Sequence, residues 1–189
     1  QGTLQSLSVY GNRLYLGGIL PVGTTTIGPF IFTNSAKTGV ILKANLNGEF
    51  FDFLKVESIT DRQSSAVSVE NDDNGNLIFT GGYYGSLSFR GTLWYTSPDT
   101  YCPYMALCDT ALQVQWAHTG EGTTSAATNS FRLFRDNNSK IYLYGSGTGF
   151  QFGSVFVPGI PFILWCDPAG EPVEVIDVNK SDNPYVKPT

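Results

Sequence analysis

A strand-like segment that ends in small residues occurs three times in this chain of 189 residues, and the repetition limits the folds it can adopt. The segments read Leu14-Tyr15-Leu16-Gly17-Gly18, Ile78-Phe79-Thr80-Gly81-Gly82 and Tyr142-Leu143-Tyr144-Gly145-Ser146. Their first glycines lie 64 residues apart, and a short polar turn precedes each segment. A fixed period of this length indicates three copies of one structural unit, with Gly17, Gly81 and Gly145 in equivalent positions.

A second apolar segment follows each of the first ones, at residues 40–44, 104–108 and 162–166. Each ends at a turn-forming residue, namely Asn45, Asp109 or Asp167. A last strand is predicted after each turn, from Phe50 to Val56, from Gln113 to Ala117 and from Val173 to Ile176. In the second copy, strands are predicted at 66–70, 77–81, 104–108 and 113–117, and the stretch 86–89 is either a strand or a shaped loop.

Short antiparallel strands that repeat in this way are typical of the blades of a β-propeller. We therefore predict an all-β fold of three four-stranded antiparallel blades, at residues 1–60, 61–124 and 125–178. Residues 179–189 are predicted to form a polar C-terminal arm or linker. Closed propellers have about four to eight blades, so we expect a partial ring, or one completed by further blades or by other copies of the chain.

The composition excludes several other classes of protein. Long helices are not expected from a chain with 21 Gly and 10 Pro. The net charge of −5 and the scattered Lys and Arg residues argue against a nucleic acid partner. No apolar run reaches the roughly 18 residues of a membrane-spanning helix. The first residues lack the pattern of a signal peptide, which predicts a cytosolic chain, a processed chain or a piece of a larger protein.

Several second-copy segments carry a further pattern. They are Asp72-Asp73-Asn74-Gly75-Asn76 with the strand to Gly82, and the segments 86–92, 103–109 and 114–117. This pattern resembles the bacterial seven-bladed β-propeller (SBBP) repeat, and the other copies match it at Gly17-Gly18, 41–45, Gly145, 150–153 and 162–170. The resemblance covers nearly the whole chain. It implies a bacterial protein that is secreted or at the cell surface, with no catalytic residues and no cofactor.

Aromatic residues gather around the long connection of the second copy: Tyr83, Tyr84, Trp94, Tyr95 and Tyr101. Exposed Tyr and Trp side chains commonly anchor protein or sugar ligands. Aromatic residues recur in the equivalent connections of the other copies, which is instead the pattern of packing between blades. Both interpretations stay open, and the tyrosine-rich second copy is the best binding candidate.

Other motifs are assigned to structure rather than to chemistry. His118 has no second ligand nearby in the sequence, so we interpret it as a strand-end residue and not as part of a triad or metal site. Residues 71–76 have calcium-loop residue types without the closing Glu, which favours a hairpin turn. Cys102, Cys108 and Cys166 are expected to be buried thiols, with one disulfide as the alternative.

These patterns predict a non-catalytic segment that scaffolds or binds protein or carbohydrate partners, without metal or cofactor. One alternative is a structural subunit of a surface assembly, whose open sheet edges pair with other chains. Another is a propeller enzyme whose site lies outside these blades. The enzyme is disfavoured because a channel site needs polar groups that converge from equivalent positions, which here are apolar or Gly.

Overall fold

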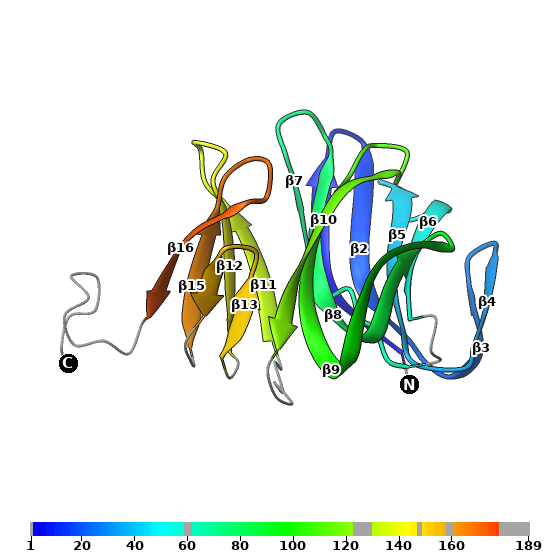
Figure 1. Cartoon of the computed structure of the whole chain (residues 1–189). Coiled ribbons are helices and arrows are strands. Elements are labelled where there is room, and N and C mark those ends of the chain that lie inside the picture. The colour runs from blue at the N-terminus through cyan, green and yellow to red at the C-terminus, as the bar shows by residue number, and fades with distance from the viewer. Residues whose placement is uncertain (1, 59–61, 123–129, 147–148, 158–160, 178–189) are drawn as a thin grey trace, which may run out of the picture.

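Antiparallel β-strands build the protein in a computed structural model that describes residues 2–58, 62–122, 130–146, 149–157 and 161–177 (Figure 1). The predicted all-β class is confirmed, because strands are the regular elements throughout these ranges. The described residues contain no helix of the length and apolar character needed to cross a membrane. The predicted arm at 179–189 lies outside the described residues.

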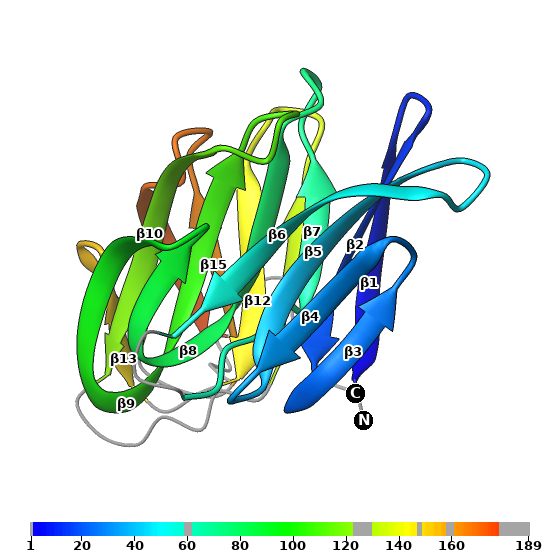
Figure 2. The same cartoon turned by 90° about the vertical axis from the view of Figure 1, so that its right-hand side faces the viewer.

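The strands form three antiparallel meanders, which we call the first, second and third units. The first unit pairs its strands in the order β1 (Thr3–Tyr10), β2 (Arg13–Leu20), β5 (Thr38–Asn45) and β6 (Phe50–Glu57). A separate hairpin, β3 (Gly23–Ile27) with β4 (Phe30–Asn34), is inserted between the second and third of these strands. Figure 2 shows this hairpin beside the first unit.

The second unit repeats the order with β7 (Ser68–Asn71), β8 (Leu77–Phe89), β9 (Thr92–Cys108) and β10 (Val114–Gly122). Here the inserted hairpin is an extension of β8 and β9 themselves, so the stretches 77–81 and 86–89 belong to one strand. Gly81 and Gly82 continue the strand because their lack of side chains leaves room for Ser65 and for the ring of Tyr101.

The third unit consists of β11 (Ser130–Arg135), β12 (Ile141–Ser146), β15 (Phe162–Cys166) and β16 (Pro172–Asp177). Its inserted hairpin is β13 (Phe150–Phe152) with β14 (Val155–Val157). Short pairings connect the meanders: β6 pairs with β8 at two positions, and β10 pairs with β13. The same order of strands and the same site of insertion thus occur three times.

Apolar side chains between the units form two cores. The core between the first and second units joins Tyr15 and Ile41 to Phe79 and Tyr104. The core between the second and third units joins Met105 to residues that include Leu143 and Phe162. A third cluster covers the outer side of the first unit and contains Phe32 of hairpin β3–β4. The first strands also lie side by side, because β7 contacts both β1 and β11.

The prediction that Gly17, Gly81 and Gly145 are equivalent is wrong for Gly17. In each unit one glycine pairs with the residue five positions before an Asp or Asn that begins a turn. These pairs are Gly18 with Val40, Gly81 with Tyr104 and Gly145 with Phe162. Gly18 is therefore the equivalent residue in the first unit.

Gly17 lies on the opposite sheet face, where a Cβ atom would come 2.9 Å from a side-chain carbon of Val69. The shift arises at the turn between the first two strands. In the first unit that turn has only two residues, because Tyr10 pairs with Arg13, whereas Asn71 pairs with Leu77 across a five-residue loop. Equal spacing along the sequence therefore does not give an equal position in the fold.

Five turns at one edge of the sheets share a single construction. Each begins with an Asp or Asn whose Oδ1 accepts backbone N–H groups from the second and fourth residues that follow, at 2.8–3.0 Å. The fourth residue of each turn has a positive φ. The turns begin at Asn45, Asp72, Asp109, Asp136 and Asp167. We call this edge the turn edge and the opposite one, which carries the inserted hairpins, the hairpin edge (Figure 1).

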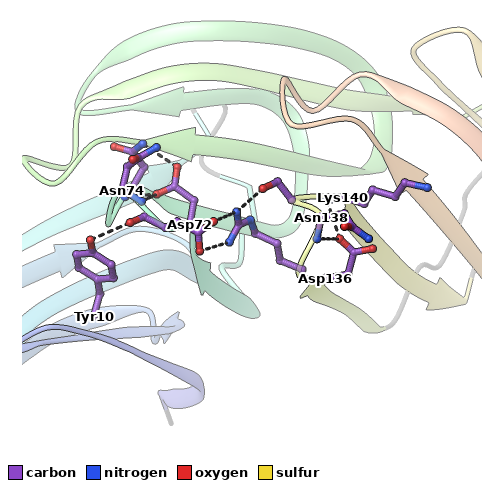
Figure 3. A network of polar contacts seen from close by, with 10 residues as sticks. Tyr10, Asp72, Asn74, Asp136, Asn138 and Lys140 are labelled. Carbon is purple, nitrogen blue, oxygen red and sulfur yellow. Dashed lines mark hydrogen bonds and ion pairs between the residues drawn. The ribbon is translucent and has the colours of Figure 1, made fainter.

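Contacts between turns join all three units at the turn edge (Figure 3). The hydroxyl group of Tyr10 donates to the backbone carbonyl of Asp73 at 3.0 Å. Arg135 donates to both carboxylate oxygens of Asp73, at 3.0 and 2.6 Å. The hydrogen bond from the Arg135 guanidinium lowers the pKa of Asp73. A single turn of the second unit therefore contacts both of its neighbours.

Candidate functional site

The five aromatic residues predicted as a binding site lie on the extension of β8 and β9, but in different surroundings. Tyr83 is 1% exposed and belongs to the core between the first and second units. Burial strongly raises the pKa of its hydroxyl group. Tyr83 therefore packs inside the protein and presents no surface to a partner.

Tyr84 and Tyr101 pair with each other across the two strands, with ring centroids 5.0 Å apart. The hydroxyl oxygen of Tyr101 lies 3.1 Å from Oγ of Ser65, within hydrogen-bond distance. Burial raises the pKa of Tyr101. The ring of Tyr101 also covers Gly82, where any side chain would collide with it. This pair anchors the hairpin to the segment that connects the first two units.

Trp94 lines a cleft between the first and second units. Its ring packs edge-to-face on Phe89, with centroids 6.0 Å apart, and partly covers the apolar core. Leu54 and Arg90 line the same cleft, and Arg90 is held by an ion pair with Asp52 at 3.3 Å. The cleft is mostly apolar apart from this arginine.

Tyr95 lines a different cleft, between the second and third units. Its other lining residues come from β10 and from hairpin β13–β14 and are mostly polar: His118, Thr119, Glu121, Gln151 and Gly153. The cleft exists because β10 pairs with β13, which places Glu121 directly opposite Gln151. We call it the Tyr95 cleft.

Hydrogen bonds fix two walls of the Tyr95 cleft. The hydroxyl group of Tyr95 donates to the backbone carbonyl of Ala117 at 2.7 Å. Burial raises the pKa of Tyr95, and the charge of Glu171 raises it further. Nε2 of His118 lies 3.3 Å from the carbonyl oxygen of Ala169 and 3.8 Å from Glu171, which forms an ion pair when the imidazole is protonated. The ring of Trp116 lies against His118, with centroids 5.1 Å apart.

This arrangement combines an aromatic ring with an amide, a hydroxyl and a carboxylate around one opening. Such a set can accept and donate hydrogen bonds while the ring contacts an apolar face, as sugar-binding sites do. Glu121 is the one carboxylate among the residues that line the cleft in the described part of the chain. A glycosidase-like pair of carboxylates is therefore not formed there.

Sequence reasoning found Tyr95 but missed its neighbours in the cleft. His118 was predicted to be a strand-end residue, and Thr119, Glu121 and Gln151 carried no recognisable motif. Their shared location depends on the pairing of β10 with β13, which joins two units. No local pattern could have indicated that pairing.

The residues with calcium-loop character form a turn instead. Oδ1 of Asp72 accepts N–H groups from Asn74 and Asn76 at 2.9 and 2.8 Å, so this oxygen already has partners. Within the described ranges, no group of three or more His, Cys, Asp or Glu side chains is placed to hold a metal ion. Cys102, Cys108 and Cys166 are buried thiols, and burial raises the pKa of Cys108 and Cys166 to about 12.

Comparisons with known proteins add no family to this description. No family model matches the chain, and a search of curated proteins found no match. The resemblance to the SBBP repeat therefore stays a prediction from the sequence.

Proposed function

We propose that the three units are blades of a β-propeller and that the protein is a non-catalytic carbohydrate-binding module of a secreted or cell-surface protein. The proposal for the fold is supported by the repeated order of strands and by the side-by-side first strands β1, β7 and β11. In a propeller, the first strand of each blade lies nearest the central axis and the sheets radiate outward.

The observation that carries the proposed binding is the composition of the Tyr95 cleft. An aromatic ring lies beside Gln151, Thr119 and Glu121, which supply amide, hydroxyl and carboxylate groups. Glu121 and the nearby Glu171 make this region acidic, and the chain carries a net charge of −5. Neutral or amino sugars therefore fit the cleft better than acidic sugars.

A glycan array followed by isothermal titration calorimetry tests this function. We expect the purified chain to bind neutral or amino-sugar glycans. The change Gln151→Ala removes hydrogen-bonding groups and is expected to weaken binding about 5- to 10-fold, as for the loss of one hydrogen bond. The change Glu121→Gln keeps the size of the side chain and reports whether the charge selects amino sugars.

The variant Gln5→Ala is a matched control, because Gln5 is an exposed glutamine on β1, away from the cleft. It is expected to bind as the unchanged chain does. The proposal fails if no glycan binds, or if Gln151→Ala and Glu121→Gln both bind with unchanged affinity and selectivity. Binding to a protein ligand instead would support the alternative of a protein-binding module.

A further inference from the structure

The two outermost sheet faces of the chain expose positions that are buried inside it. Every unit has a front face, toward the unit before it in the sequence, and a back face, toward the unit after it. The front face of the first unit and the back face of the third unit have no neighbouring unit within the described residues.

The register of the strands shows what is exposed on the first unit. Leu7, Val69 and Leu133 occupy equivalent front-face positions, because they pair with Leu16, Phe79 and Leu143 in their own units. Val69 is 3% exposed and Leu133 is 8% exposed, since each packs against the preceding unit. Leu7 is 57% exposed, and the neighbouring front-face residue Val9 is 54% exposed.

The back face of the third unit shows the same contrast. Phe134 is 63% exposed and lines an open apolar groove together with Tyr142, Tyr144 and Ile163. The residue equivalent to Ile163 in the second unit is Met105, which is fully buried against the third unit. The groove therefore has the composition of a junction between units that lacks its second half.

The two internal junctions match in chemistry at one level of the first strands. Between the first and second units, Oγ of Ser8 donates to Oδ1 of Asn71 at 2.7 Å, so two polar groups meet. The equivalent front-face residue of the third unit is Arg135, which bonds to Asp73 in the adjoining turn of the second unit. Polar meets polar at the first junction, and opposite charges meet at the second.

The two unpartnered positions at the same level also match each other. The back-face position held by Ser8 is held by Phe134 in the third unit, and the front-face position held by Asn71 and Arg135 is held by Val9 in the first unit. An apolar residue would therefore meet an apolar residue if the third unit of one chain packed on the first unit of another.

We propose that two copies of this chain associate head to tail, with Phe134 of each packed against Leu7 and Val9 of the other, to close one ring of six units. The proposal rests on the propeller arrangement proposed above and extends it to the oligomeric state. Head-to-tail contacts either close into a ring or continue as a filament. Two chains give six units, within the range of closed propellers, whereas three chains would give nine.

Native mass spectrometry and analytical ultracentrifugation test the association. The unchanged chain is expected to have twice its monomer mass of 20.6 kDa. Phe134→Glu and Val9→Lys are each expected to give monomers, because a charge would be buried in both junctions. The double variant is expected to dimerise again, since each new carboxylate then faces a new ammonium group, and this dimer should dissociate at high salt.

Phe156→Glu is the matched control, because Phe156 is 54% exposed on β14 and lies outside both end faces. It is expected to leave the dimer intact. A monomeric unchanged chain at about 100 μM overturns the proposal, since only a marginal interface dissociates at that concentration. A filament, or a dimer that survives both single changes, overturns it as well.

The same samples separate this proposal from the proposed function. The Tyr95 cleft lies between the second and third units of one chain, so monomeric Phe134→Glu should still bind glycan if the cleft is the site. A dimer that binds no glycan contradicts the proposed ligand alone. A glycan-binding monomer contradicts the proposed ring alone.

Discussion

The turn edge and the hairpin edge differ in how the three units resemble one another. At the turn edge, five turns repeat the same Asp or Asn, the same hydrogen bonds and the same positive φ at the fourth position. At the hairpin edge, the three insertions differ: a separate hairpin in the first and third units, and a strand extension in the second. Both clefts that contain Trp94 or Tyr95 involve an insertion.

The comparison teaches that local chemistry builds one edge and tertiary contacts build the other. A turn that begins with Asp or Asn satisfies its own backbone groups, so it can be repeated in any unit. At the hairpin edge, Ser65 is buried and bonds to Gly82, and its carbonyl oxygen accepts a 2.8 Å hydrogen bond from Tyr104. These contacts depend on residues far apart in the sequence, so each insertion is free to differ.

The largest effect is expected from Gly81→Ala, at the hairpin edge. A methyl group there would collide with the backbone carbonyl of Ser65, which cannot move aside as a flexible side chain could. We expect the free energy of unfolding to fall by about 3 kcal/mol or more, as for severe overpacking. Urea denaturation followed by tryptophan fluorescence measures the change.

Gly48→Ala is the control for Gly81→Ala, because Gly48 lies in a turn-edge turn with no heavy atom near its would-be Cβ. Its φ of 83° alone should cost about 1 kcal/mol. Equal losses for the two variants would show that the close contact at Ser65 is not the cause, and the contrast between the edges would be lost.

A smaller effect is expected from Asp109→Ala, at the turn edge. The change removes the oxygen that accepts N–H groups from Ala111 and Gln113 at 2.8 and 2.9 Å. The expected loss is about 1–2 kcal/mol, the usual cost of unpartnered backbone donors. Asp109→Asn keeps an oxygen in this place and should stay near the unchanged stability in thermal unfolding. A loss as large for Asn as for Ala would mean that charge, and not turn geometry, matters.

The smallest effect is expected from Ser139→Gly, and it has the opposite sign. Ser139 has a φ of 66° at the position that glycine holds in three of the five turns. Glycine relieves this strain at the cost of greater freedom in the unfolded chain and of the contact with Arg135, so we expect a net gain of about 0.5 kcal/mol. Differential scanning calorimetry can detect it, and a lower melting temperature would show that the contact with Arg135 outweighs the strain.

Prediction from the sequence succeeded where the signal was local. The apolar segments and the turn-forming residues Asn45, Asp109 and Asp167 gave the strands on either side of them, because a turn and its flanking strands are specified by adjacent residues. The prediction failed at Gly17, where a shorter turn shifted the register by one residue. One residue is enough to move a side chain to the opposite face of a sheet.

The candidate site was predicted only in part. The cluster of aromatic residues around Tyr83 and Tyr95 was visible in the sequence, but burial separates the two: Tyr83 is in a core and Tyr95 lines a cleft. Whether a residue of β8 or β9 faces a core or an opening depends on which unit packs against it. That information lies in strands more than 20 residues away.

The sequence alone determined the all-β class, the threefold repetition and the turns at one edge, because these depend on the periodicity of strands and on turn chemistry between neighbouring residues. The tertiary structure decided which glycine is equivalent in each unit, which aromatic rings are buried, and that Tyr95, Glu121 and Gln151 share one cleft. These features arise where separate sheets pack together, and packing depends on the register and facing of whole strands rather than on any short segment.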